Sequence, residues 1–199
     1  MSSEFSFQMA VGGLIALFLP VGVYHRLRAA TGEPLRRRDE GLFILIALRL
    51  SGLLGMLAIV AYLFAPRRLA WSQIELPTWL RWVGLPIGLV AGVWLFWVLH
   101  TLGPNLTDTV TVRAHATLVT HGPYRWVRHP FYLAALLIIL SFSLLTASLW
   151  VAIVGGVALT LLIVRSRTEE AQLEARFGAA YRAYRDRTGF LFPRLHASS

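Results

Sequence analysis

Long apolar stretches, separated by short groups of polar residues, dominate the chain. Three of them have the length of a membrane-spanning helix, which is about 20 residues, and they cover 5–24, 41–65 and 78–102. A fourth stretch, 131–165, is about twice the length of a short span, so we divide it into two helices near 145–149. The pattern predicts an all-α integral membrane protein with five transmembrane helices and a cytosolic C-terminal amphipathic helix.

We expect the whole chain, 1–199, to form a single membrane domain. Residues 1–100 would supply three N-terminal transmembrane helices, and 101–199 would supply the half that carries the chemistry. The first apolar stretch has no basic segment before it and no small-residue cleavage site after it, so we interpret it as a retained span and not a signal peptide.

A polar segment with an apolar stripe follows the last predicted span. At helical spacing, Leu173, Phe177, Tyr181 and Tyr184 share one face, while arginines occupy the others. We expect one continuous amphipathic helix that lies against the bundle or the membrane surface and covers the mouth of a site. Residues 106–120 alternate only weakly and are expected to be extended or irregular.

Composition supports a membrane protein and narrows its chemistry. Charged residues make up 15% of the chain and the mean hydropathy is +0.61, unlike a soluble domain. The absence of cysteine excludes disulfides, thiolate catalysis and iron–sulfur clusters. The six histidines show no close ligand spacing, so we expect no metal site.

All the positive charge behind the formal net charge of +9 comes from arginine, and its distribution predicts an orientation. Fifteen arginines fall on the side of the loop 25–40, and three (Arg67, Arg68 and Arg81) fall on the other. This bias places the N-terminus outside and the C-terminus in the cytosol. Because the arginines flank apolar spans, we interpret them as a basic membrane rim and expect no nucleic-acid partner.

Turn residues, aromatic residues and cations are concentrated in 121–132. Pro130 suits the first position of a helix, which places Arg128 and His129 just outside a helix N-terminus whose free N–H groups favour an anion. Gly122-Pro123 turns the chain so that Tyr124 can face the same point. A basic membrane anchor would explain some of these residues, but the convergence favours an anion-binding site.

The predicted hairpin brings a second charged group to this point. With a turn near Ala147, Pro130 lies level with Arg165, so Arg128 and His129 approach Arg167, Glu169 and Glu170. Cations and carboxylates at a helix N-terminus suit a zwitterionic ligand, such as an amino acid head group. Arg49 stands apart within the second span, where it either meets a substrate anion or pairs within the bundle.

The ordered motifs resemble the isoprenylcysteine carboxyl methyltransferases, and phospholipid methyltransferases look similar in the same places. They are Leu118-Val119-Thr120-x-Gly122-Pro123-Tyr124, then Arg128-His129-Pro130-x-Tyr132, then Arg167-Thr168-Glu169-Glu170 with Leu173, Phe177-Gly178, Tyr181 and Tyr184. The resemblance covers about 102–193 and is closest to the prokaryotic members. It therefore implies a bacterial or archaeal cell membrane, with the active site facing the cytosol.

The resemblance implies S-adenosyl-L-methionine as the cofactor. The residues expected to bind it are Leu118, Val119, His121, Gly122, Pro123, Tyr124, His129, Tyr132, Glu169 and Glu170. Arg128, Arg165 and Arg49 are the candidate catalytic residues, facing the carboxylate of the cofactor or the substrate. From the apolar stripe we further expect Glu170 to make the polar contacts in the cofactor pocket and Glu169 to be largely solvated.

The methyl acceptor stays open between a carboxylate of isoprenylcysteine type, a phospholipid amine and a small thiol. A carboxylate needs no general base, whereas a thiol or an amine needs one, for which His121 and His129 are available. Membrane sterol-type reductases that use NADPH share part of the pattern, but Phe131 and Leu133-Ala134 replace their usual residues. We expect a lipophilic substrate and no obligate protein partner.

Overall fold

The computed structural model describes residues 3–29, 42–103 and 117–194, and this part of the chain is helical throughout, without a strand. The α-helices are α1 (Ser3–Arg28), α2 (Leu42–Phe64), α3 (Thr78–Leu102), α4 (Pro130–Thr146), α5 (Leu149–Phe177) and α6 (Ala179–Arg187). Two 3₁₀ helices, η2 (Pro66–Ser72) and η4 (Gly122–Arg125), stand in the connections.

Four of the described helices are long and apolar enough to cross a membrane: α1, α2, α3 and α5. The predicted second and third spans agree with α2 and α3 to within a residue or two, and α1 extends a few residues beyond the first. Helix α4 has only 17 residues, or roughly 25 Å, which is shorter than the hydrocarbon layer. Of the five predicted spans, the described residues therefore supply four helices long enough to cross a membrane, and α4 is a shorter apolar helix packed against α3 and α5.

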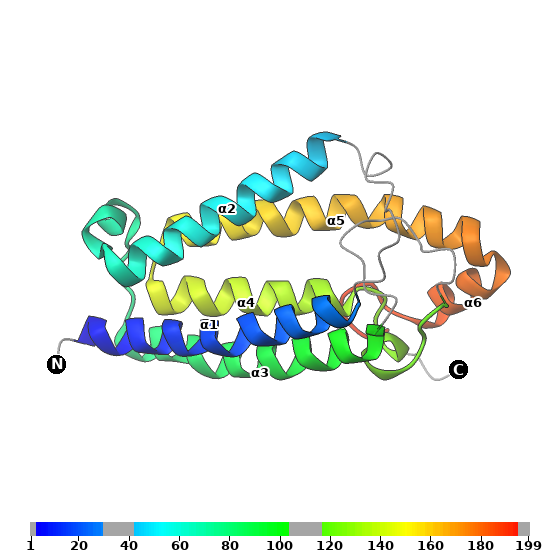
Figure 1. The fold of residues 1–199 in the computed structure, drawn as a ribbon, viewed down its shortest axis with the longest axis horizontal. Helices are drawn as coiled ribbons and strands as arrows, with labels where there is room; N and C mark the ends of the chain where they lie inside the picture. The colour runs from blue at the N-terminus through cyan, green and yellow to red at the C-terminus, as the bar shows by residue number, and fades with distance from the viewer. Residues whose placement is uncertain (1–2, 30–41, 104–116, 195–199) are drawn as a thin grey trace.

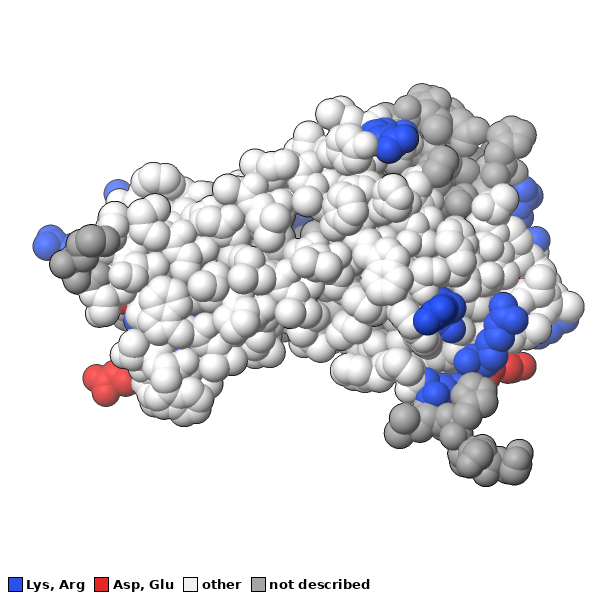
Figure 2. Space-filling view, turned by 90° about the horizontal axis from the view of Figure 1, so that it is seen from below, with Lys and Arg blue, Asp and Glu red and all other residues white. Residues whose placement is uncertain are grey.

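The helices run lengthwise in an elongated bundle (Figure 1). Helix α3 packs most extensively on α4, α2 packs on α5, and α4 joins the two groups through α5. Helix α5 extends past the end of α4, and α6 folds back there (Figure 1). Charged side chains lie towards the ends of the face in Figure 2, and its middle is mostly uncharged, as a membrane-spanning bundle requires.

Small residues bring α3 close to its neighbours. A Cβ on Gly84 would lie 2.7 Å from the carbonyl oxygen of Ser141, and one on Gly88 would lie 2.5 Å from Leu14. The hydroxyl of Ser141, which is fully buried, donates to the carbonyl of Gly84 at 2.6 Å. This close backbone approach replaces the hydrophobic effect as the source of helix association in lipid.

The predicted hairpin turn lies where the sequence placed it. Helix α4 ends at Thr146, Ala147 adopts a left-handed conformation with φ of 48°, and Ser148 caps α5 by accepting from the N–H of Val151. The connection after η2 docks on this turn, because the N–H of Ile74 donates to the carbonyl of Ala147 at 2.8 Å. The turn is thus fixed from both sides.

The prediction of one continuous amphipathic helix after the last span is wrong. Helix α5 does not end near Arg165 but continues to Phe177, because the residues beyond the apolar run are good helix formers. Gly178 then adopts a φ of 53°, which ends α5 and redirects the chain into α6. Tyr181 and Tyr184 therefore belong to a separate helix.

Helix α6 lies against the end of the bundle, as expected for the C-terminal helix. Tyr181, Tyr184 and the following Thr188 are buried at helical spacing, while Arg182 and Arg187 are exposed. Residues 117–120 have no regular structure, in agreement with the prediction for 106–120. The rest of that segment, and most of the loop 25–40, lies outside the described residues.

Candidate functional site

The loop that leads into α4 is shaped by Gly122. Its φ is 58°, in the left-handed region, and a Cβ there would lie 2.6 Å from the side-chain oxygen of Thr101 on α3. Only glycine fits both conditions without strain. The turn is continued by η4, within which Pro123 is buried, so that the loop lies against the C-terminal end of α3.

Pro130 is the first residue of α4, as predicted, and His129 occupies the position before the helix. The His129 side chain makes no capping hydrogen bond to the helix backbone. Its imidazole Nε2 instead lies 2.9 Å from Oε1 of Glu170 on α5, and the ring is buried. The N-terminus of α4 thus directs an imidazole across the hairpin.

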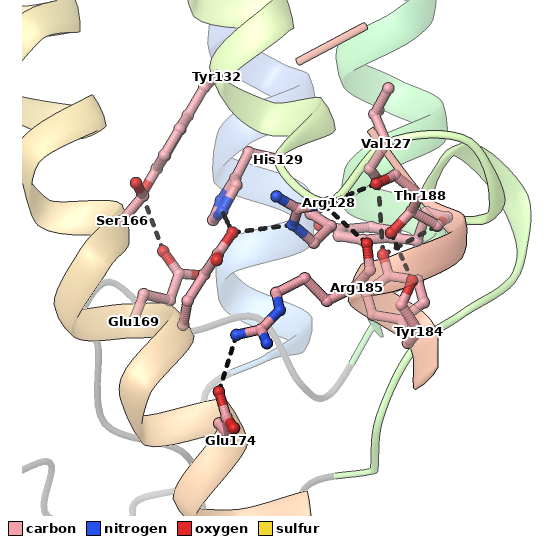
Figure 3. Close-up of polar contacts among 12 residues, drawn as sticks. Val127, Arg128, His129, Tyr132, Ser166, Glu169, Glu174, Tyr184, Arg185 and Thr188 are labelled. Atoms are coloured by element: carbon pink, nitrogen blue, oxygen red, sulfur yellow. Dashed lines mark hydrogen bonds and ion pairs between the residues drawn. The ribbon is translucent and has the colours of Figure 1, made fainter. Parts of the chain in front are cut away.

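Arg128 and His129 converge on the same carboxylate oxygen (Figure 3). The Nε of Arg128 donates to Oε1 of Glu170 at 2.9 Å, the oxygen that also contacts His129. The Arg128 and Glu170 side chains are only 11% and 20% exposed, so solvent and salt screen their attraction less than that of a surface pair. The anion held by the two predicted residues in this structure is therefore a carboxylate of the chain itself.

The chain segment after α6 completes the cluster by pairing with the loop. Backbone N–H groups of Arg128 and His129 donate to the carbonyls of Gly189 and Phe190 at 2.8 and 3.1 Å. Nη1 of Arg128 donates to the carbonyl of Thr188 at 2.6 Å, and the Phe190 ring lies 4.8 Å from that of His129. Sequence reasoning missed these partners of Arg128 and His129, because no periodicity marks a segment that pairs over such a sequence distance.

Glu169 makes a separate contact with α4. The Tyr132 hydroxyl donates to Oε2 of Glu169 at 2.8 Å (Figure 3), and the Tyr132 ring stacks on His129 with centroids 4.8 Å apart. The expectation that Glu169 is largely solvated is wrong: it is half-buried and bonded, because α5 is already regular at this point. Arg165, one turn earlier on α5, is also half-buried, and its charge acts on Tyr132.

Tyr124 joins the site through both its side chain and its backbone. Burial, followed by the charges of Glu169 and Tyr184, raises the pKa of the Tyr124 phenol above its ordinary value. Its carbonyl accepts from the Tyr184 hydroxyl at 2.8 Å, which ties η4 to α6. The structure thus brings Tyr124, Tyr132 and Glu169 to one place, as the sequence suggested for these residues.

The remaining predicted residues are less closely engaged. Leu118 and Val119 are half-buried in the segment before η4, and His121 is exposed at its start. Arg49 is exposed on α2, and none of the hydrogen bonds or ion pairs described here joins it to the cluster. Among the described residues, the structure therefore shows no direct bond between Arg49 and the residues around Glu170.

The carboxylate oxygens of Glu169 and Glu170 fit a ligand that carries N–H or O–H groups. The bonds described above use Oε1 of Glu170 and Oε2 of Glu169, and the second oxygen of each carboxylate takes part in none of them. Carboxylate oxygens accept from ammonium and hydroxyl groups. S-adenosylmethionine offers both, in its amino acid head group and its ribose, so the residues present fit this cofactor.

Comparison with known families agrees with this geometry. Residues 82–175, which include the loop, the α4–α5 hairpin and both glutamates, match the model of the isoprenylcysteine carboxyl methyltransferase (ICMT) family. This part of the chain is similar to that family, as the motifs indicated. The match begins within α3 and ends just before Gly178, so it includes neither the first two helices nor α6.

The proteins similar to the chain include two curated relatives and one solved structure. It is 37% identical over 116 residues to the cobalt-zinc-cadmium resistance protein CzcN of Cupriavidus metallidurans, covering 52% of this chain and 53% of the relative. It is 30% identical over 142 residues to methanethiol S-methyltransferase 2 of Bradyrhizobium diazoefficiens, covering 64% and 54%. The chain thus spans about half the length of each relative.

The similar structure is that of the eukaryotic intramembrane Ras methyltransferase ICMT. It covers 97% of this chain and 68% of that chain, with a TM-score of 0.60 and 20% sequence identity. At this identity the match describes the fold. It includes α1 and α2, for which the sequence motifs gave no relative.

Proposed function

We propose that this protein is an integral membrane methyltransferase that uses S-adenosyl-L-methionine and acts on a lipophilic acceptor. The observation that carries the proposal is the mouth of the α4–α5 hairpin. There Arg128, His129 and Glu170 form one network beside Glu169 and Tyr132, all within the segment that matches the ICMT family. The family and a relative named as a methyltransferase support the reaction class.

The chain's role towards the cofactor is to bind and orient it, because transfer of a methyl group needs mainly correct positioning. When bound, the cofactor supplies a methyl group on a positively charged sulfur. Glu169 and Glu170 would accept hydrogen bonds from its amino or ribose hydroxyl groups. Arg128 and His129 hold Glu170 in place, and the loop with Leu118 and Val119 would line the apolar side.

For the acceptor, our first candidate is a carboxylate of isoprenylcysteine type. A carboxylate is ionised at neutral pH and needs no general base. This suits a site in which His129 is already engaged by Glu170. Arg49 is the candidate for holding an acceptor anion, since it lies exposed on a spanning helix where an unpaired charge is costly.

A small thiol is the second candidate, favoured by the relative named methanethiol S-methyltransferase 2. A thiol must lose its proton before it attacks, so this reaction would require a general base. The exposed imidazole of His121, at the start of η4, is the available group. Substitution of His121 by alanine should then abolish thiol methylation and leave carboxylate methylation largely unchanged.

We further propose that the protein resides in a cell membrane with this mouth facing the cytosol, where the cofactor is available. The arginine distribution supports this orientation. Cysteine-substitution labelling of intact cells tests it. A cysteine near Arg182 should resist a membrane-impermeant maleimide, whereas a cysteine near Arg68 should react.

The deciding experiment measures binding and turnover with the protein in lipid nanodiscs. Calorimetry should show binding of S-adenosylhomocysteine, the demethylated product, and none of NADPH. Methyl-labelled cofactor is then supplied with a prenylcysteine, a phospholipid amine or a small thiol, and the labelled product identifies the acceptor. Tight NADPH binding with no binding of S-adenosylhomocysteine would overturn the proposal in favour of a reductase.

A further inference from the structure

The two tyrosines of α6 differ in how their hydroxyl groups are satisfied. The Tyr184 hydroxyl donates to the carbonyl of Tyr124 at 2.8 Å. The Tyr181 hydroxyl, one turn earlier, is buried and has no hydrogen-bond partner in the part of the chain that the structure describes. The whole Tyr181 side chain is only 1% exposed. A buried hydroxyl without a partner is costly, so native proteins rarely retain one without a reason.

The surroundings of Tyr181 place it at the proposed cofactor site. Burial raises the pKa of its phenol above the ordinary value, the charges of Glu170 and Glu169 raise it further, and Arg128 acts in the opposite direction. All three charged residues belong to the cluster at the mouth of the α4–α5 hairpin (the mouth cluster), so the phenol lies within electrostatic reach of this cluster. The raised pKa keeps the hydroxyl protonated at neutral pH, and it therefore remains a hydrogen-bond donor.

The break at Gly178 is what brings this side chain to the cluster. A helix that continued straight from α5 would carry the residues after Phe177 further along its own axis, away from α4. Instead α6 folds back and Tyr184 fixes its position against the loop. Tyr181 is thereby held rigidly, with its hydroxyl unused by the protein itself.

We infer that the Tyr181 hydroxyl donates a hydrogen bond to an oxygen of the bound cofactor, either its carboxylate or its ribose. This inference rests on the proposed function. It complements the two glutamates, which offer only acceptors, by adding a donor for the oxygen atoms of the same ligand. It also extends the binding site beyond the segment matched by the family, because Tyr181 lies after residue 175.

The test compares Tyr181→Phe with Tyr184→Phe, a matched pair on one helix, in lipid nanodiscs. Without ligand, Tyr181→Phe should unfold at the same temperature as the unmodified protein or higher, because it removes an unsatisfied group. Tyr184→Phe should unfold at a lower temperature, because it leaves the Tyr124 carbonyl without its donor. By calorimetry, Tyr181→Phe should bind S-adenosylhomocysteine about tenfold more weakly.

The ligand oxygen is identified with 5′-methylthioadenosine, which keeps the ribose and lacks the carboxylate. Tyr181→Phe should lose affinity for this compound as well if the contact is to the ribose, and only for S-adenosylhomocysteine if it is to the carboxylate. Binding of S-adenosylhomocysteine by Tyr181→Phe within twofold of the unmodified protein would overturn the inference and leave the proposed function intact. Failure of the unmodified protein to bind it would overturn both.

Discussion

The Nε of Arg128 lies 2.9 Å from Oε1 of Glu170, although the two residues are 42 positions apart in the sequence. One belongs to the loop before α4 and the other to the end of α5 that extends past α4. Since His129 contacts the same oxygen, a single carboxylate orients two neighbouring side chains. The pair closes the mouth of the hairpin. Arg128 also holds α6 and the segment after it, because its guanidinium donates to the carbonyls of Arg185 and Thr188.

We predict that Glu170→Gln destabilises the protein by about 1–3 kcal/mol, because a neutral amide replaces the carboxylate that pairs with the largely buried guanidinium of Arg128. Thermal or denaturant unfolding in detergent micelles measures this loss. The control is Glu174→Gln one turn later, whose pairs with Arg182 and Arg185 are more exposed. That substitution should cost about 1 kcal/mol or less. Equal losses in the two variants would show that the mouth cluster is no stronger than a surface pair.

The sequence predicted this cluster because its signals are local. Pro130 marks the start of α4, and the middle of the long apolar run marks the turn at Ala147. Counting equal numbers of residues along two antiparallel helices from this turn brings Pro130 level with Arg165, so that Arg128 approaches Glu170. Helix geometry alone places the two charged groups together.

The features that the sequence did not predict depend on contacts between distant segments or on a single backbone angle. No periodicity in the sequence indicates that the segment after α6 pairs with the loop through the carbonyls of Gly189 and Phe190. The end of α5 did carry a signal, Gly178, but the apolar stripe continued through it and favoured one helix. The length of α4 relative to the hydrocarbon layer is likewise set by the turn at Ala147 and not by hydropathy.

Binding of S-adenosylhomocysteine should distinguish the two adjacent glutamates. Glu170→Gln replaces the carboxylate shared by Arg128 and His129 with a neutral amide, and we expect its affinity to fall about ten- to a hundredfold, as for loss of a charge-assisted hydrogen bond. Glu169→Gln keeps an amide oxygen that can still accept from the Tyr132 hydroxyl. A smaller loss is therefore expected. Calorimetry on both variants measures the two losses of affinity. A larger loss for Glu169→Gln would assign the main ligand contact to Glu169.

Arg49 gives a prediction that separates substrate binding from folding. Arg49→Leu removes a charge from a spanning helix without breaking any described bond, so stability should be unchanged or slightly higher. The KM for an anionic acceptor should rise about tenfold, corresponding to one lost charged contact. Affinity for S-adenosylhomocysteine should not change.

The matched control for Arg49 is Arg68→Leu, an exposed arginine at the opposite end of the bundle in η2. It should alter neither the KM nor the affinity for the cofactor product. If Arg49→Leu also leaves the KM unchanged while its stability falls, Arg49 serves the fold and not the acceptor.

Gly122→Ala should disturb the loop that leads to the site. The substitution adds a Cβ at a φ of 58° and at 2.6 Å from the Thr101 oxygen, so both strain and a steric clash oppose it. We expect a destabilisation of about 1–3 kcal/mol, together with weaker binding of S-adenosylhomocysteine. Combining it with Thr101→Ser, which removes the methyl group 2.9 Å away, should recover part of the loss. An unaffected single variant would show that the loop adopts another conformation.

Arg81 lies at the end of the bundle opposite to the proposed cofactor site. We expect its substitution to lower stability without changing ligand binding. Its guanidinium donates to Glu4 of α1 at 2.9 and 3.0 Å, and to the carbonyl of Leu145 at the end of α4 at 2.7 Å. It also lies 3.8 Å from the centroid of the Phe7 ring. The Arg81 side chain is 13% exposed, so these contacts are largely protected from solvent.

Because Arg81 joins α1, α3 and α4, we expect Arg81→Gln to cost about 1–3 kcal/mol of unfolding free energy. A double-mutant cycle with Glu4→Gln should give a coupling energy of about 1 kcal/mol, since Glu4 is partly exposed and solvent weakens the pair. The affinity for S-adenosylhomocysteine should stay unchanged below the unfolding temperature, since the contacts of Arg81 lie at the other end of α3 from the mouth. A loss of affinity as large as that of Glu170→Gln would mean that the contacts of Arg81 at one end of the bundle are coupled to the ligand site at the other end.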